Sequence, residues 1–254
     1  MLNDKVALIT GGSSGIGQAI AVRYAAAGAR VAVVASADVA KAQVTVDMIR
    51  AAGGVAEAFA ADVRNRDAVS DMLGRVISGL GQVDILVTAA GVFLPSPIGE
   101  ADIDIFDMMV DTNLKAAFLC INAVVPGMKQ RGGGRIICLS SVAATFGVSG
   151  FSAYCATKAA VSQMVRALAI ELAPYDININ AIAPGNTETP MNEAMRTDPT
   201  HAEMLRGLQA ATPSIRSFST PQDIAELAFF LASPAARAMH GSTVLIDEGL
   251  SAGM

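Results

Sequence analysis

Short apolar runs that alternate with helical patterns constrain the fold of this chain most strongly. Seven runs rich in Val, Ile and Ala are apolar at almost every position, as is typical of strands covered on both faces of a sheet. They span residues 5–10, 30–35, 55–61, 83–89, 135–140, 177–183 and 242–247, and helical patterns occupy 16–27, 39–52, 67–79, 104–131, 153–173 and 221–232. The alternation predicts an α/β fold, in which helices on both faces doubly wind a seven-stranded parallel sheet.

Composition favours one large domain. The chain has 254 residues, 52% of them apolar and 16% charged, so it can bury a sizeable core. No linker or change in composition divides it, and we expect a single domain over residues 1–254. Residues 190–219 are the exception, because they form a long, polar, proline-interrupted insertion before the last apolar run.

Charge and cysteine content argue against several classes of function. A formal charge of −5 without a basic stripe disfavours nucleic acid or an anionic membrane surface as a partner. Three cysteines and two histidines show no metal-type spacing, so no metal site is expected. Charges or prolines interrupt the apolar runs before the ~18 residues of a membrane span, and the N-terminus lacks the pattern of a secretory signal. We therefore expect a cytoplasmic protein with free thiols.

A glycine cluster follows the first predicted strand directly. In TGGSSGIGQAI, Gly11, Gly15 and Gly17 stand between strand and helix, where glycine permits positive φ and close approach of the backbone to a ligand. The N–H groups at the start of the next helix favour a pyrophosphate. Many strand–helix turns use glycine, but this position after the first strand indicates dinucleotide binding.

Tyr154 and Lys158 lie four residues apart in SAYCATKAAV, so they share one face of a predicted helix. The spacing also occurs by chance, in which case the lysine simply reaches solvent. The small neighbours Ala156, Ala159 and Ala160 favour a closely packed helix, in which an outward lysine is harder to explain.

Together these motifs resemble the short-chain dehydrogenase/reductase family, from Val6 to about Gly253. The spacing Thr-Gly-x-x-x-Gly-x-Gly matches the family's glycine motif, and Tyr154 and Lys158 match its Tyr-x-x-x-Lys signature. The resemblance implies a single Rossmann domain that binds NAD(P).

The resemblance also implies a catalytic tetrad. The family's serine, thirteen residues before the tyrosine, is met by Ser141, and its asparagine by Asn113 in DTNLKAAF. Together with Tyr154 and Lys158, Ser141 and Asn113 complete the expected tetrad. Ser140 is the weaker candidate, since it faces the other way if the strand continues.

Further motifs of the family imply the cofactor contacts. ADV at 61–63 matches the segment beside the adenine, TAAG at 88–91 the segment beside the ribose, and PGNTET at 184–189 the segment beside the nicotinamide. The expected contacts are Gly11, Ser13, Ser14, Gly15, Ile16, Gly17, Ser36, Asp62, Val63, Ala89, Ala90, Gly91, Tyr154, Lys158, Pro184, Gly185, Thr187 and Thr189.

The end of the second predicted strand favours NADP(H) over NAD(H). NAD-selective members commonly carry an aspartate there for the ribose 2′-hydroxyl, whereas this chain has Ala35 and Ser36. Asp38 comes later and is better interpreted as a helix cap. The Ser36 hydroxyl can bind a 2′-phosphate, although the sequence offers no Arg or Lys near Ser14 or Ser36.

Two segments depart from the family pattern. TAAG replaces the usual Asn-Asn-Ala-Gly and removes side-chain hydrogen bonds that brace the sheet. DEG at 247–249 replaces Asp-Gly-Gly, and the sequence suggests no function for Glu248.

The tetrad suggests how a tyrosine acts as both acid and base. Lowering a phenol pKa from near 10 by about three units needs roughly 4 kcal/mol in favour of the phenolate. A cation about 5 Å away, at an effective dielectric near 20, supplies roughly 3 kcal/mol, so we expect Lys158 to lower the pKa of Tyr154. Ser141 would hydrogen-bond the substrate oxygen, and Asn113 would hold a water that links Lys158 to solvent. The alternatives are a turn residue at Ser141, a cap or kink at Asn113 and a helix cap at Thr189.

An apolar set is expected to line the substrate site with Ser141: Phe93, Leu94, Val142, Phe146, Phe151 and Met191. It fits a small or medium, mostly uncharged ketone or secondary alcohol. Because residues 190–219 follow Thr189 directly, we expect them to form a substrate lid rather than filler.

The leading hypothesis is an NAD(P)-dependent alcohol dehydrogenase or ketone reductase. The alternative, a 3-oxoacyl-carrier-protein reductase, needs basic residues beside the cleft. Lys129 and Arg131 are candidates, but Asp176 stands where another basic residue is expected. A non-catalytic dinucleotide sensor is a remote alternative, because such proteins typically lose the tyrosine or lysine. The family also implies a homotetramer, with helices 104–131 and 153–173 at one interface.

Overall fold

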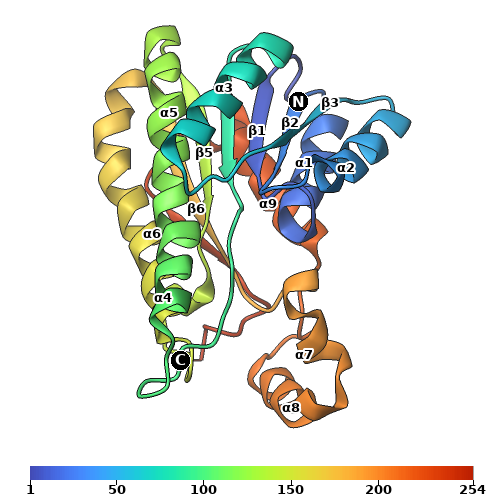
Figure 1. Cartoon of the computed structure of the whole chain (residues 1–254), viewed down its shortest axis with the longest axis vertical. Coiled ribbons are helices and arrows are strands. Elements are labelled where there is room, and N and C mark those ends of the chain that lie inside the picture. The colour runs from blue at the N-terminus through green and yellow to red at the C-terminus, as the bar shows by residue number, and fades with distance from the viewer. Residues whose placement is uncertain (254) are drawn as a thin grey trace.

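One parallel sheet takes strands from almost the whole chain, of which the computed structural model describes residues 1–253 (Figure 1). The strand order is β3-β2-β1-β4-β5-β6-β7. The strands are β1 Val6–Thr10, β2 Arg30–Ala35, β3 Val55–Ala60, β4 Ile85–Thr88, β5 Gly134–Leu139, β6 Ile177–Pro184 and β7 Thr243–Ile246. The predicted α/β fold is confirmed, and each predicted run coincides with a strand to within two residues at either end.

Helices cover both faces of the sheet (Figure 1). One face carries α1 (Gly15–Ala26), α2 (Val39–Ala51) and α9 (Pro221–Ala232), and the other carries α3 (Arg66–Leu80), α5 (Ala116–Arg131) and α6 (Ser152–Leu172). Alternate strand residues supply the two cores: Ala7 and Ile9 of β1 face the first set of helices, and Val6 and Leu8 face the second. The strands are continuously apolar because both faces are buried.

Helix boundaries follow the local signals. Gly28, Gly53, Gly81 and Gly132 end helices with φ between 67° and 101°, in the left-handed region that glycine adopts most readily. Asp38 caps α2, because its carboxylate accepts a 2.9 Å hydrogen bond from the backbone N–H of Ala40. The interpretation of Asp38 as a helix cap is therefore confirmed.

The helix predicted over 104–131 is not uniform. It consists of α4 (Ile103–Met109), a π-helical turn η1 (Val110–Lys115) and α5. The wider turn contains Asn113, and such turns are frequent at functional sites. By length and composition the whole stretch would pass as a membrane-spanning helix. Its buried residues, among them Cys120 and Val124, pack instead into the core beneath the sheet.

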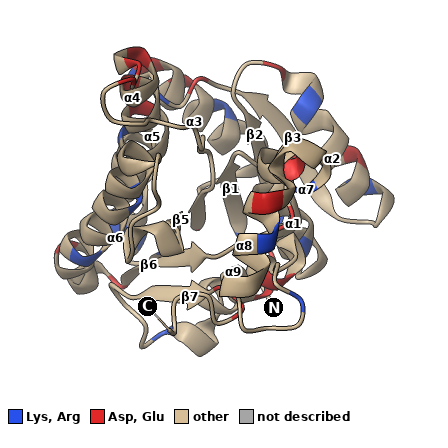
Figure 2. Ribbon diagram, turned by 90° about the horizontal axis from the view of Figure 1, so that it is seen from below, with Lys and Arg blue, Asp and Glu red and all other residues tan. Residues whose placement is uncertain are grey.

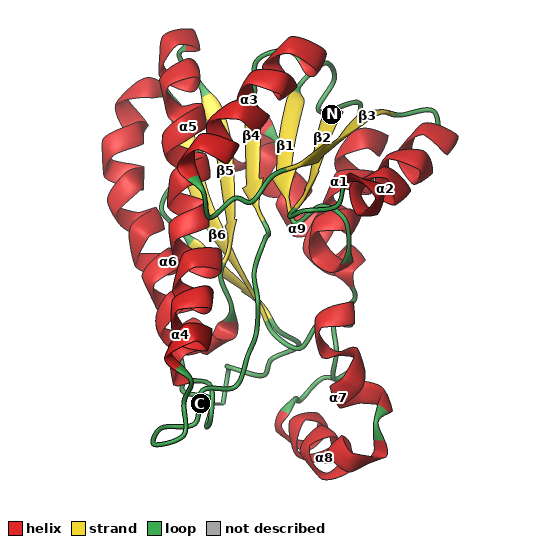
Figure 3. Cartoon of the chain, viewed as in Figure 1, coloured by secondary structure: helices red, strands yellow, loops and turns green. Residues whose placement is uncertain are grey.

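Residues 190–219 carry structure of their own. They contain α7 (Glu193–Thr197) and α8 (Ala202–Ala211), with 3-10 turns at Pro190–Asn192 and Pro199–His201. Figure 3 shows α7 and α8 beyond the carboxyl ends of the strands, joined to the sheet by loops. No residue of α8 is fully buried, so this helix makes few contacts with the main body.

Tyr24 provides a test of the packing between α1 and α9. Its ring is fully buried, and its hydroxyl donates a 2.8 Å hydrogen bond to the Ala228 carbonyl. Tyr24→Phe should lower the free energy of unfolding by about 1 kcal/mol, because this buried bond is lost while the ring remains. Urea denaturation measures the effect. The half-exposed Tyr175 is the matched control, and Tyr175→Phe should leave stability unchanged; equal effects would contradict the assignment.

Candidate active site

A cavity of about 700 Å³ opens at the carboxyl ends of the strands. Its lining residues follow β1 through β6, as expected at the edge where parallel strands end. Gly11 after β1 and Ala89 after β4 meet where the strand order reverses. Figure 2 looks onto this edge and shows that charged residues lie mainly on the surrounding helices.

The glycine loop is held too tightly for any side chain. Gly11 has φ +67°, and a Cβ there would lie 2.8 Å from the backbone nitrogen of Ala90. A Cβ at Gly17 would collide with the Gly11 carbonyl. Gly15 has φ +51°, and its missing side chain leaves the space in front of Thr189 open. The side chain of Ser14, which precedes α1, makes no capping bond, so this loop and helix end fit a pyrophosphate.

Ser141, Tyr154 and Lys158 converge on the cavity wall. Ser141 follows β5, and its Oγ accepts a 3.2 Å hydrogen bond from the Ala143 N–H. Lys158 is only 6% exposed, and its Nζ donates a 2.9 Å hydrogen bond to the Leu139 carbonyl and lies 5.7 Å from the centre of the Tyr154 ring. The predicted helical spacing therefore does bring the tyrosine and lysine into one space.

Ser140 serves a different purpose from its neighbour. Its Oγ donates a 2.9 Å hydrogen bond to the backbone carbonyl of Lys158 and lies 2.8 Å from Ser162 Oγ. It thus ties the end of β5 to α6, which fixes the lysine's backbone, while Ser141 remains the serine beside Tyr154.

Aromatic packing fixes the Tyr154 ring. Phe93 meets it edge-on with ring centres 4.7 Å apart, and Phe93 in turn stacks on Phe151 at 4.2 Å. Such contacts limit ring rotation, so the hydroxyl is held in one direction.

Asn113 is buried behind the cavity rather than in its lining. Its Oδ1 accepts a 2.8 Å hydrogen bond from the Val92 N–H, and its Nδ2 donates to the Val92 carbonyl (3.0 Å) and to Thr157 Oγ1 (3.2 Å). The side chain therefore fixes the backbone after β4 and links it to α6. It does not cap its helix, although it lies within the π-helical turn that interrupts the helix, and its role in holding a water stays a prediction.

Burial dominates the electrostatics of the pair. It raises the pKa of Tyr154, while hydrogen bonding to Ser141 opposes the shift. It also lowers the pKa of the Lys158 ammonium to about 8. Desolvation of the phenolate is the largest effect on Tyr154 in this structure, and the expected lowering of its pKa by Lys158 together with an oxidised nicotinamide stays a prediction.

Known proteins share both the sequence and this arrangement. The family model described as enoyl-(acyl carrier protein) reductase matches residues 11–251. The chain is 36% identical over 247 residues to 3-oxoacyl-[acyl-carrier-protein] reductase FabG of Staphylococcus epidermidis, covering 97% of this chain and 99% of that protein. A short-chain type dehydrogenase/reductase from Mycobacterium marinum superposes with a TM-score of 0.92 at 35% identity, covering 98% and 96% of the two chains. The chain belongs to the short-chain dehydrogenase/reductase family.

The structure of a third relative contains a bound cofactor. The structure of a gluconate 5-dehydrogenase from Burkholderia cenocepacia was determined in complex with NADP and tartrate. It superposes with a TM-score of 0.92 at 30% identity, covering 100% of this chain and 97% of that one. The present chain is accordingly an NAD(P)-dependent oxidoreductase.

Most residues that the family motifs singled out lie around the cavity. Except for Asn113, all the expected catalytic and cofactor-contacting residues line it, as do the expected substrate residues Phe93, Val142, Phe146, Phe151 and Met191. Leu94 does not. Thr189 also begins the 3-10 turn at Pro190, where it shares a capping box with Asn192, so the cap and the cofactor contact are compatible.

Several lining residues were missed from the sequence. Arg64 follows the ADV motif directly, so extending that motif by one residue would have identified it. Met204 and Leu208, four apart on α8, show the i, i+4 apolar spacing of an amphipathic helix that sequence inspection could have detected. Leu250 comes from the C-terminal tail, and no local signal identifies it.

The buried lysine predicts an unusual pH dependence of stability. A pKa of about 8 in the folded state, below the ~10.4 of an unfolded lysine, means that the unfolded chain binds more protons between these values. The free energy of unfolding of the protein should therefore rise as the pH increases from the folded-state to the unfolded-state pKa of this lysine. Lys158→Met should therefore stabilise the protein at pH 7, by up to about 3 kcal/mol, and the gain should shrink towards pH 10.

Urea denaturation at several pH values measures this difference. Lys41→Met, at an exposed position on α2, makes the same chemical change and should show no such trend. Destabilisation by Lys158→Met across the whole pH range would contradict the prediction.

Proposed function

We propose that the protein transfers hydride between a nicotinamide cofactor and a secondary alcohol or ketone, with Tyr154 as general acid and base. The observation that carries the proposal is the convergence of Ser141, Tyr154 and Lys158 on a cavity whose other wall is the glycine loop. Bound NAD(P) supplies the hydride acceptor or donor. The protein's part is to align the substrate and move a proton.

Each side chain has a stated task in that scheme. Tyr154 Oη gives its proton to the carbonyl oxygen during reduction and takes the hydroxyl proton during oxidation. Ser141 Oγ donates a hydrogen bond to the same oxygen and stabilises negative charge there. Lys158 Nζ supplies positive charge beside the phenol, and Asn113 holds the backbone of Val92, next to the cavity.

Tyr154→Phe tests this assignment. It should lower kcat about 10²- to 10⁴-fold, because proton transfer is lost, while the dissociation constant of NADPH stays unchanged. Turnover of uncharged ketones and fluorescence of bound NADPH provide the two measurements, with Tyr175→Phe as the surface control. Undiminished turnover in Tyr154→Phe would refute the role of Tyr154. If the parent protein binds NADPH but reduces no ketone, the sensor hypothesis is supported.

NADP(H) is the proposed cofactor. Ala35 and Ser36 leave no carboxylate at the end of β2, and the Asp38 carboxylate is engaged as the cap of α2. Arg64 adds a cation that the sequence motifs did not identify. It lines the cavity and donates hydrogen bonds of 2.9 and 2.8 Å to Asp62. A 2′-phosphate would meet the Ser36 hydroxyl and gain attraction from this guanidinium.

Titration with NADPH and NADH, followed by nicotinamide fluorescence, tests the preference. NADPH should bind more tightly, and Arg64→Ala should weaken NADPH binding about tenfold while leaving NADH binding unchanged. Arg66→Ala, at a strongly exposed side chain (82%), is the control. Tighter NADH binding, or equal effects of both substitutions, would overturn the preference.

The proposed substrate is uncharged. Among residues 1–253, the charged groups lining the cavity are Asp62, Arg64 and Lys158, two of them beside the expected adenine segment. The part of the cavity wall that residues 190–219 contribute is largely apolar. Its lining residues include Pro190, Met191, Met195, Met204 and Leu208. A carboxylate substrate would find no cation in that part, whereas a neutral ketone would bury apolar surface.

The 3-oxoacyl-carrier-protein reductase alternative is favoured by the similarity to FabG over nearly the full length. The basic patch suggested for it is not supported. Lys129 lies over the Tyr175 ring and Arg131 binds Gln82 and the Val83 carbonyl, which precede β4. Both therefore lie at the opposite edge of the sheet from the cavity.

A homotetramer remains part of the proposal. Exposed apolar side chains on the outer helices, Ile103 and Phe106 of α4, Phe118 of α5 and Ile170 of α6, support an interface there.

A further inference from the structure

Glu248 occupies a backbone conformation that suits glycine. Its φ is +56°, in the left-handed region that side chains with a Cβ rarely adopt. Its side chain is nevertheless only 10% exposed. Strain of this kind persists where the surrounding contacts enforce it, so the contacts of Glu248 are informative.

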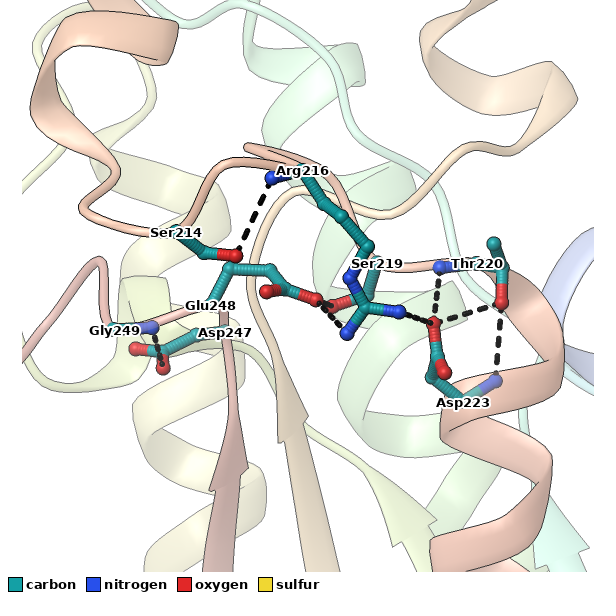
Figure 4. Close-up of polar contacts among 8 residues, drawn as sticks. All are labelled: Ser214, Arg216, Ser219, Thr220, Asp223, Asp247, Glu248 and Gly249. Carbon is teal, nitrogen blue, oxygen red and sulfur yellow. Dashed lines mark hydrogen bonds and ion pairs between the residues drawn. The ribbon is translucent and has the colours of Figure 1, made fainter.

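Those contacts tie the C-terminal tail to the end of the 190–219 segment (Figure 4). Glu248 Oε1 lies 2.8 Å from an Arg216 guanidinium nitrogen and accepts a 3.3 Å hydrogen bond from Ser219 Oγ. Its backbone carbonyl accepts a hydrogen bond of 3.2 Å from the Ser214 N–H. Arg216 also lies 3.7 Å from Asp223 at the start of α9.

Ser219 extends this connection to the cavity wall. Its N–H donates to the Asn186 carbonyl at 2.9 Å, and its own carbonyl accepts from the Glu188 N–H at 3.0 Å. Leu250, two residues beyond Glu248, lines the cavity together with Met204 and Leu208 of α8. The Glu248 carboxylate thus connects the C-terminal tail to the segment that carries α8 and, through Ser219, to residues 186–188.

We propose that Glu248 is a positioning residue for substrate binding. Through Arg216 and Ser219 it holds residues 213–219, so that α8 stays over the apolar part of the cavity. The inference rests on the proposed function, in which that part receives the ketone. It assigns Glu248 no contact with substrate or cofactor.

Glu248→Gly and Arg216→Met test the proposal from the two sides of the ion pair. Glycine suits the left-handed backbone, so Glu248→Gly should fold normally. In both variants KM for an uncharged ketone should rise about fivefold to twentyfold, while kcat and the NADPH dissociation constant change little. The double variant should be no worse than either single one, because both remove the same connection.

Limited trypsin digestion gives a readout that does not depend on activity. Cleavage after Arg196 and Arg206 should be faster in both variants than in the parent protein, because the segment is less firmly held. Glu226→Gln, which breaks the surface ion pair between Arg23 and Glu226 (2.6 Å), is the matched control and should change neither KM nor cleavage.

The outcomes separate the inference from the proposed function. Unchanged KM and unchanged cleavage in both variants would overturn the role of Glu248, as would a loss of thermal stability without either effect. If both variants are cleaved faster but the parent protein itself reduces no ketone, the role of Glu248 in holding the segment stands and the proposed reaction is refuted instead.

Discussion

Parallel pairing of every strand is the constraint on which the site depends. Because all seven strands run in one direction, the residues that follow them gather at a single edge of the sheet. There the backbone after β1 approaches the backbone after β4 so closely that Gly11 leaves no space for a Cβ, and Gly17 in turn packs directly against the Gly11 carbonyl. The glycine loop, the TAAG segment and Ser141 thus share one cavity because of the strand order itself.

The sequence predicted what depends on local pattern. Strand positions, the Asp38 cap and the helical proximity of Tyr154 and Lys158 all follow from periodicity or spacing, and these are confirmed. No local sequence pattern predicted the π-helical turn that contains Asn113, or the hydrogen bonds of that side chain to Val92, 21 residues earlier. The position of the basic residues near 130 was predictable, because they directly precede β5 and therefore lie at the amino edge of a parallel sheet, opposite the cavity.

The buried tyrosine and lysine illustrate why function and stability oppose each other here. Burial raises the phenol pKa and lowers the ammonium pKa to about 8, so both shifts favour the neutral forms. The simple Coulomb argument from sequence omitted this desolvation, which raises the pKa of Tyr154 in this structure. What the packing around Phe93 and Leu139 provides instead is a fixed geometry, in which the hydroxyl and the ammonium need no reorganisation when charge develops.

In the proposed reaction, chemistry and substrate choice therefore reside in differently built parts of the molecule. Tyr154 and Lys158 stand on α6 and Ser141 directly follows β5, whereas Met191, Met195 and Met204 line the cavity from the 190–219 segment, whose end at residues 214–219 is bound to Glu248. Methionine side chains adapt to varied shapes, so α8 alone would select substrates weakly. Selectivity then depends on how firmly the ends of that segment are fixed. A strained, nearly buried Glu248 beside Arg216 is therefore better explained by the position of α8 than by the stability of the tail alone.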